Sequence, residues 1–157
     1  MSKTTKATLA LETAGAAFTL HVYAYDPAGQ RVGLQAAEAL GEDPCRVLKT
    51  LMAEVDGKPV CVVIPSDQEV SMKKLAAAFG GKSAAMMKVP DAERLTGFVV
   101  GGISPFGQKR AVPTAMEEMA LLEKRVYING GQRGLQVRLD PTEALRVLGA
   151  QAVDLIA

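Results

Sequence analysis

The apolar residues of the chain recur with the spacing of helices in some segments and of strands in others. Helices are expected where apolar residues lie three or four apart between capping residues, at 4–14, 34–40, 71–79, 90–97 and 141–148. Strands are expected where apolar residues alternate or run together, at 18–25, 47–55, 60–64, 84–89, 125–129, 135–139 and 152–156. These elements do not alternate strictly, which favours an α+β fold over a parallel α/β sheet.

Turn and cap residues set several of the boundaries. Asp56 and Gly57 suit a tight turn, so strands 47–55 and 60–64 are expected to pair as a hairpin. Strand 47–55 is largely apolar on both alternating faces, which predicts a central position in the sheet. The run 140–143, Asp-Pro-Thr-Glu, has the form of a capping box with proline at the first helical position.

The first helix and the first strand each show one apolar face. In 4–14 the residues expected to face the core are Leu9, Ala10 and Ala14. In 18–25 the residues expected on the core face are Phe18, Leu20, Val22 and Ala24. The opposite face of this strand could line a cleft, and it carries His21, Tyr23 and Tyr25.

Residues 112–123 fit two structures. Met116, Met119 and Ala120 share a helical face, whereas Pro113 and the neighbouring strands favour an extended segment. The chain shows neither an internal repeat nor a linker. We therefore expect one domain over residues 1–157, with a mixed or antiparallel, partly closed sheet.

Composition narrows the class of protein. The 157 residues are 48% hydrophobic and 22% charged, which excludes a disordered or collagen-like chain. With 18 Lys and Arg against 17 Asp and Glu, the formal net charge is +1, so nonspecific binding to DNA or to an acidic membrane is not expected. The N-terminus lacks the apolar core of a signal peptide and no apolar run reaches about 18 residues, so we expect a cytoplasmic protein.

Two cysteines and one histidine limit the available chemistry. Cys45 and Cys61 lack the spacing of zinc ligands, and we expect neither a metal nor another cofactor. His21 is the one histidine and stands on a polar strand face, where a structural role is commoner than that of a general base. A Ser-His-Asp triad is therefore not expected.

Lys49 is the first candidate for function, because its strand face otherwise holds Val47, Leu51 and Val55. Lysine is seldom placed among buried aliphatic residues unless it meets an anion. The alternative is a lysine that reaches past the sheet edge to solvent or pairs with a carboxylate. The strand pattern alone favours neither.

The second candidate is the glycine loop, Gly101-Gly102-Ile103-Ser104-Pro105, which follows an apolar run. It matches neither the dinucleotide fingerprint nor the P-loop. Glycines let a ligand approach the backbone and Pro105 stiffens the turn, so fixed N–H groups could bind a carbonyl oxygen or an oxyanion. A tight loop that merely needs positive φ explains the same glycines.

Basic residues are frequent in the second half of the chain. They could contact phosphates or form a solvated face, and they are Lys109, Arg110, Lys124, Arg125, Arg133 and Arg138. Tyr127 is the single aromatic residue among them, so a stacking platform for single-stranded nucleic acid is not expected.

Four blocks occur in an order typical of one family. They are 33–41 (GLQAAEALG), 46–51 (RVLKTL), 97–109 (GFVVGGISPFGQK) and 128–135 (INGGQRGL). Together they resemble the YbaK/EbsC family of small aminoacyl-tRNA deacylases, which is related to the editing insertion of bacterial prolyl-tRNA synthetase. The resemblance extends from about Phe18 to Ile156 and implies a curved, barrel-like mixed sheet flanked by helices.

The resemblance also implies an activity, namely hydrolysis of the ester between a wrongly attached amino acid and the terminal adenosine of tRNA. The Lys-Thr-Leu block is most similar to the Cys-tRNA(Pro) deacylase branch, which acts in trans, with Cys-tRNA(Cys) as a second candidate substrate. Lys49 matches the functional lysine of the family, and the loop Gly101 to Pro105 matches its substrate-binding loop, with catalytic roles for Gly101, Gly102, Ile103 and Ser104. Tyr23 and Val32 match positions that line the aminoacyl pocket.

Two positions depart from the family pattern. Gln136 replaces an acidic residue, and Leu34-Gln35 replaces a more polar pair. Gln136 can hydrogen-bond a ligand but cannot act as a base near neutral pH, which leaves the amino-acid preference open. The implied partners are the 3′ end of a mischarged tRNA and, transiently, prolyl-tRNA synthetase.

No protein nucleophile or base stands out in the sequence, because His21, Cys45, Cys61 and Ser104 lack an activating partner. This favours a mechanism in which the substrate supplies reactive groups and the protein orients them. Lys49 would anchor the terminal phosphate or stabilise developing charge. A non-catalytic module that binds tRNA ends or a synthetase is the main alternative, and a small-molecule or nucleotide-binding protein is the third.

Overall fold

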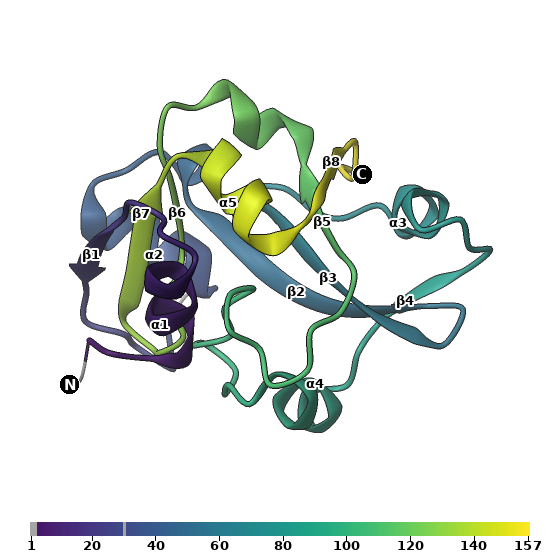
Figure 1. Cartoon of the computed structure of the whole chain (residues 1–157), viewed down its shortest axis with the longest axis horizontal. Helices are drawn as coiled ribbons and strands as arrows, with labels where there is room; N and C mark the ends of the chain where they lie inside the picture. Colours follow the sequence, from purple (N-terminus) through teal and green to yellow (C-terminus); the bar gives the residue numbers. More distant parts are fainter. Residues whose placement is uncertain (1–2, 30) are drawn as a thin grey trace.

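Two β-sheets flanked by helices make up the computed structural model, which describes residues 3–29 and 31–157 (Figure 1). The helices are α1 (Lys6–Thr13), α2 (Val32–Leu40), α3 (Met72–Ala78), α4 (Val89–Thr96) and α5 (Pro141–Leu148), with the 3-10 turns η1 (Pro44–Arg46) and η2 (Glu118–Leu122). The strands are β1 (Thr19–Val22), β2 (Leu48–Val55), β3 (Lys58–Pro65), β4 (Ala84–Met86), β5 (Thr114–Glu117), β6 (Val126–Asn129), β7 (Leu135–Leu139) and β8 (Gln151–Val153). The expected α+β fold class is confirmed.

The larger sheet has the order β4-β2-β3-β5-β8, and the smaller has the order β1-β7-β6. β2 and β3 form the expected antiparallel hairpin, which turns at Asp56 and Gly57 with positive φ at both residues. β5 adds to β3, and β8 to β5, in parallel. A bridge between Val47 and Tyr127 links the two sheets, so the β-structure is mixed, curved and partly closed.

The β2–β3 hairpin is buried on both faces and crosses the middle of the molecule (Figure 1). On one face Leu48 and Met52 join a core cluster with residues of α1, α5, β6 and β7. On the other face Ala53 and Val55 pack in a second cluster with Leu75 of α3. Burial on both sides holds β2 rigidly, which fixes the direction of the polar side chains that it carries.

The prediction for the inward face of the first helix was wrong for Leu9, whereas Ala10 packs against the core as expected. α1 buries Ala7 and Leu11, whereas Leu9 is 50% exposed. The reason lies at the N-cap, where Thr5 and Thr8 form a capping box and the Thr5 hydroxyl donates to Gly130 O at 2.5 Å. This long-range bond fixes the rotation of the helix about its axis.

The first strand is shorter than predicted. β1 ends at Val22, which is 46% exposed, while Tyr23 is buried. The ring of Tyr23 packs in a small cluster that also holds Ala36, Val47 and Tyr127. The predicted core face is therefore wrong at Val22 and Ala24, which are exposed, because a tertiary pocket receives Tyr23 instead.

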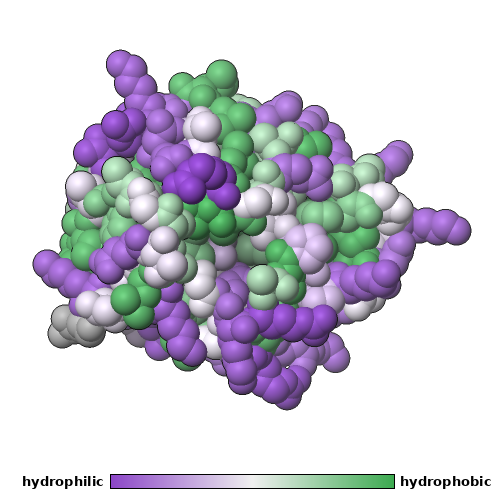
Figure 2. Space-filling model, in the orientation of Figure 1, coloured by the Kyte–Doolittle hydropathy of each residue, from purple (hydrophilic) through white to green (hydrophobic). Residues whose placement is uncertain are grey.

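Segment 112–123 combines extended and helical structure. β5 takes its first half and η2 its second, and Met119, Leu121 and Leu122 of η2 are exposed. Figure 2 shows hydrophobic residues at the upper edge of the molecule, where Figure 1 places η2. None of the helices in the described part of the chain has the length and apolar character needed to cross a membrane.

α5 spans the predicted residues 141–148, but its cap is simpler than expected. Asp140 accepts a hydrogen bond from the N–H of Thr142, and Gly149 ends the helix with positive φ. Glu143 pairs with Arg146 and does not complete a capping box.

Glu117, at the end of β5, is a buried carboxylate held by backbone donors. Glu117 is only 1% exposed, and its Oε1 atom accepts a hydrogen bond from the N–H of Leu155 at 2.8 Å. Oε2 accepts from the N–H of Met119 at 2.9 Å. Glu117 therefore ties both η2 and the C-terminal segment to the larger sheet.

Replacing Glu117 with alanine is expected to lower the free energy of unfolding by about 2–4 kcal/mol, because two buried N–H groups lose their acceptor. Urea denaturation monitored by circular dichroism measures the change. Glu117→Gln retains one acceptor oxygen and is expected to lower the free energy of unfolding by roughly half as much. An alanine variant as stable as the wild type would contradict this role.

Candidate functional site

An open cleft of about 530 Å³ lies along the edge of β2. β4 pairs only with residues 53–55 of β2, so in the described structure β4 does not cover the edge of residues 48–52. The cleft is bounded by the start of α2, the segment before α3, the start of α4 and the glycine loop. The ends of β6 and β7 close its inner side through Asn129 and Gln136.

Lys49 lines this cleft, and its side chain is only 15% exposed. Its Nζ lies 3.7 Å from Oε1 of Glu69, a carboxylate that also pairs with Arg31. Burial lowers the pKa of the Lys49 ammonium group, and the charge of Glu69 opposes this effect. Lys49 therefore faces a ligand-sized space and an exposed carboxylate at the same time.

The glycine loop is attached to the turn between β6 and β7. The Asn129 side chain donates from Nδ2 to the carbonyl oxygen of Gly101 at 3.1 Å. The Arg133 guanidinium donates from Nε to the carbonyl oxygen of Val100 at 2.8 Å. Gly101 has a φ of +91°, which requires glycine at the point where these two bonds draw the loop inward.

Two N–H groups of the loop have no acceptor among the described residues. Gly101 and Ile103 both line the cleft, and within residues 3–29 and 31–157 their N–H groups donate to no protein acceptor. The N–H of Gly102 between them is used, because it donates to Val99 O at 2.8 Å. The loop therefore carries two unused backbone donors on residues that line the same cleft as Lys49.

The remaining predicted loop residues lie behind the cleft lining. Ser104 is fully buried, and its Oγ accepts from the N–H of Phe106 at 3.1 Å. Its carbonyl oxygen accepts from Gln108 Nε2 at 3.0 Å. Gly102 and Pro105 are also buried. In this arrangement the three residues support the shape of the loop, and their catalytic roles stay predictions.

Three buried polar atoms near the inner wall make no hydrogen bond in the described structure. They are the hydroxyl of Tyr23, Oγ1 of Thr50 and Oε1 of Gln136. Thr50 and Gln136 line the cleft, whereas Tyr23 lies beyond the lining. Unsatisfied buried polar atoms are costly, so a ligand that supplies partners would be favoured here.

Val32 lines the cleft from the first turn of α2, and its place in an aminoacyl pocket stays a prediction. The next residue explains the close approach of this helix to the sheet, because a Cβ on Gly33 would lie 2.5 Å from Cβ of Ser66. Ser66 is itself buried and donates its hydroxyl to Val47 O at 2.6 Å. Gly33 thus allows Val32 to reach the cleft.

His21 does not line the cleft. Its ring contacts Tyr127 edge to face, and Nε2 lies 2.8 Å from the hydroxyl of Thr19. Burial and the charge of Arg138 lower the pKa of the imidazole. These contacts agree with the structural role expected from the sequence.

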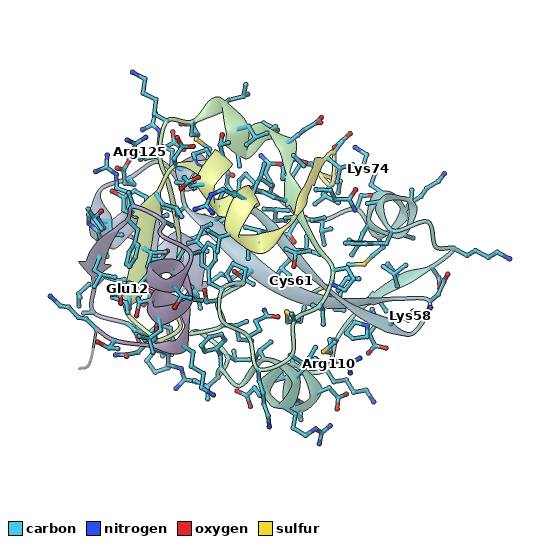
Figure 3. All side chains as sticks on the ribbon, in the orientation of Figure 1. Glu12, Lys58, Cys61, Lys74, Arg110 and Arg125 are labelled. Carbon is cyan, nitrogen blue, oxygen red and sulfur yellow. The ribbon has the colours of Figure 1, made fainter. Side chains whose placement is uncertain are left out.

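Neither cysteine has the character of a nucleophile. Burial, together with the nearby Asp43 carboxylate, raises the pKa of the Cys45 thiol to about 11. Cys61 lies in the interior of β3 (Figure 3), where burial raises its pKa to about 12. Both thiols are therefore protonated at neutral pH.

This predicts slow alkylation of Cys45. At pH 8 iodoacetamide is expected to label it at least roughly tenfold more slowly than free cysteine, since the loss of thiolate outweighs the higher reactivity of a more basic thiolate. The rate is expected to rise about tenfold per pH unit between pH 8 and 10, as thiolate forms. Mass spectrometry of the labelled peptide measures the rate. A rate that levels off near pH 8 would show an ordinary or lowered pKa.

Several cleft residues were missed by the sequence interpretation. Asn129 was read only as part of a turn, and Thr50 only as a strand residue. Arg31 and Glu69 carried no signal, because they lie in separate loops that only the fold brings together. The apolar lining was not singled out as a site in the sequence, and it includes Leu51, Met52, Val70, Met72, Met86, Met87, Val89 and Ala92.

The basic residues that follow the glycine loop lie elsewhere. Lys109 and Arg110 border a second, shallower hollow beside α4, and Figure 3 shows Arg110 there. They do not line the cleft that holds Lys49. No group of three metal-binding side chains occurs among the residues that the structure describes.

Comparisons with known proteins give a consistent result. Residues 30–147 match the model of the aminoacyl-tRNA editing domain family. The proposed Cys-tRNA(Pro)/Cys-tRNA(Cys) deacylase EbsC of Enterococcus faecalis is 39% identical over 121 residues, which cover 76% of this chain and 73% of that protein. The proline–tRNA ligase of Maridesulfovibrio salexigens is 29% identical over 68% of this chain, but the match spans only 18% of the ligase.

Solved structures have the same fold. The crystal structure of a proposed trans-editing enzyme for prolyl-tRNA synthetase superposes with a TM-score of 0.82 and 26% identity, covering 97% of this chain and 95% of that one. The hypothetical protein APE2540 superposes with a TM-score of 0.86 at 23% identity, covering 98% of this chain and all of that one.

Proposed function

The chain belongs to the aminoacyl-tRNA editing domain family, and from this premise we propose that it is a trans-editing deacylase. It hydrolyses the ester of a mischarged tRNA, with Cys-tRNA(Pro) as the leading substrate and Cys-tRNA(Cys) as the second. The observation that carries the proposal is that Lys49, Gly101 and Ile103 line one cleft and that the N–H groups of Gly101 and Ile103 have no acceptor in the described structure.

In the proposed reaction the ester carbonyl oxygen accepts hydrogen bonds from the N–H groups of Gly101 and Ile103. Water attacks the carbonyl carbon, negative charge develops on that oxygen, and each fixed donor stabilises it by roughly 3 kcal/mol. The bond from the carbonyl carbon to the ribose oxygen then breaks. The ribose oxygen takes a proton, which leaves a free amino acid and an uncharged tRNA.

The proton of the attacking water goes to a group of the substrate. The ionisable side chains that line the described cleft are Arg31, Lys49 and Glu69, and Glu69 is held by both cations at the mouth. A neighbouring ribose hydroxyl can accept this proton while it passes its own proton to the departing ribose oxygen, and a cysteinyl ester can accept it on its sulfur in the thiolate form. The protein then acts mainly by orientation.

We assign the inner wall to the aminoacyl group. Thr50 and Gln136 line the cleft, and their buried Oγ1 and Oε1 atoms, for which the described structure gives no hydrogen bond, would become acceptors for its α-amino group once the side chains turn toward the cleft. The Tyr23 hydroxyl lies behind them, where burial raises its pKa and a contact with Gln136 opposes that shift. Because Gln136 is neutral, it recognises the amino group without attracting its charge.

The partners follow from the same proposal. Affinity for tRNA is expected to be weak, since the net charge is only +1, and selection among tRNAs is then delegated to prolyl-tRNA synthetase in a transient complex. The working compartment is the cytoplasm, where tRNA is charged. DNA and membranes are not expected partners.

A binding module without catalysis is the second candidate. It is favoured by one observation, namely that the described cleft lining holds no side chain free to act as a base. Such a module would retain aminoacyl-tRNA without releasing the amino acid.

The test is hydrolysis of purified Cys-tRNA(Pro), Cys-tRNA(Cys), Ala-tRNA(Pro) and Pro-tRNA(Pro), each compared with its spontaneous loss. We expect multiple turnovers on the cysteinyl substrates and none on Pro-tRNA(Pro). A preference for alanine would keep the enzyme class and change the substrate. Binding of all four without cleavage would overturn the proposal in favour of the binding module.

A further inference from the structure

Two cations converge on one anion at the mouth of the cleft. Glu69, in the segment before α3, forms an ion pair with Arg31, which precedes α2. The same Oε1 atom lies 3.7 Å from Nζ of Lys49 on β2. Three separate segments therefore bring a guanidinium and an ammonium group to a single oxygen.

The carboxylate at this position is easily replaced. The side chains of Arg31 and Glu69 are 62% and 64% exposed, and an ion pair this exposed contributes little to stability. Glu69 is the one acidic residue among the described lining of the cleft. Asp67 also acts on Lys49 through its charge, but it does not line the cleft.

The start of α2 adds to the attraction for an anion. Arg31 occupies the N-cap position, and no side chain caps the helix among the described residues. The first N–H groups of a helix favour negative charge near them. A group bound between Arg31 and Lys49 would lie beside this helix end.

We propose that Arg31 and Lys49 form a phosphate subsite and that the Glu69 carboxylate occupies it as an internal competitor. The proposal deepens the proposed function and rests on it, since the ligand is the 5′-phosphate of the terminal adenosine of tRNA. On binding, the phosphate takes the place of Glu69, and Arg31 can contact two of its oxygens. The tRNA end then enters past α2 and the segment before α3, and its ester reaches the glycine loop.

The experiment titrates the whole protein with AMP, adenosine or inorganic phosphate at low salt, followed by NMR chemical shifts. Glu69→Gln removes the competing charge and is expected to raise the affinity for AMP about two- to fivefold, while the affinity for adenosine stays unchanged. Glu143→Gln is the matched control, because Glu143 also pairs with an arginine on the surface but does not line the cleft. It should leave AMP binding at the wild-type level.

The role of Arg31 is measured in the Glu69→Gln background, where no carboxylate is left to move onto Lys49. In that background, Arg31→Gln is expected to lower the affinity for AMP several-fold without changing the affinity for adenosine. The proposal is overturned if Glu69→Gln and Glu143→Gln bind AMP equally, or if the phosphate adds nothing to the affinity of adenosine. Inorganic phosphate should show a similar gain, because it meets the same competitor. Binding of inorganic phosphate as tight as that of AMP would show a general anion site and would overturn the assignment to the tRNA end.

These outcomes are separable from those of the deacylase assay. If the protein cleaves Cys-tRNA(Pro) but its affinity for AMP does not depend on Glu69, the phosphate subsite is contradicted and the deacylase activity stands. The expected AMP pattern without cleavage of any aminoacyl-tRNA would retain the subsite and remove the proposed activity.

Discussion

Lys49→Met is expected to lower kcat/KM for ester hydrolysis by about 100-fold or more and to leave the fold intact. The ammonium group is largely buried beside the cleft, so its truncation removes a charged partner from a site of reduced solvation. Methionine retains the aliphatic stem that packs along β2 and carries no charge. The change is measured as deacylation of the aminoacyl-tRNA that the wild type hydrolyses fastest, at substrate concentrations well below KM.

Lys58→Met is the matched control, because it makes the same substitution on the same hairpin. Lys58 starts β3 beside the exposed turn and points away from the body of the molecule (Figure 3). Its variant should keep wild-type kcat/KM. Similar activity of the two variants would remove Lys49 from the site, and unfolding midpoints of both proteins separate a loss of activity from a loss of structure.

The elements that could be predicted from the sequence are those with local causes. The hairpin at Asp56 and Gly57 and the helix 141–148 depend on turn and cap residues that act within a few positions. The rotation of α1 and the burial of Tyr23 could not be predicted, because they depend on contacts with Gly130 and with the Val47 cluster far along the chain.

The residues of the candidate site likewise divide into those with a local signal in the sequence and those without one. Lys49 and the glycine loop stand out in the sequence because a lysine among aliphatic residues and clustered glycines are locally unusual. Asn129 does not stand out, although it holds Gly101 through a side-chain hydrogen bond, because the pair is 28 residues apart. Arg31 and Glu69, 38 residues apart, meet only when α2 and the segment before α3 lie on the same β2 edge.

Gly102→Ala is expected to lower kcat/KM for ester hydrolysis by roughly 100-fold and to destabilise the protein by about 1–3 kcal/mol. A Cβ at this position would lie 2.9 Å from the backbone nitrogen of Arg133 and 3.0 Å from the carbonyl carbon of Gln132. These are backbone atoms of the β6–β7 turn, which cannot move aside as a flexible side chain could. Because Asn129 and Arg133 attach the loop to the same turn, relief of the clash displaces the N–H groups of Gly101 and Ile103.

Gly41→Ala separates the loss of stability from the displacement of the loop. Gly41 ends α2 with a φ of +67° and has no atom within 4 Å of an added Cβ, so alanine there costs about 1 kcal/mol of backbone strain and creates no contact. It should keep full kcat/KM despite a lower melting temperature. If Gly102→Ala is equally active, the loop tolerates displacement, and the ester carbonyl is not held by its N–H groups. If its activity falls while Gly41→Ala stays active, the position of those donors governs the rate.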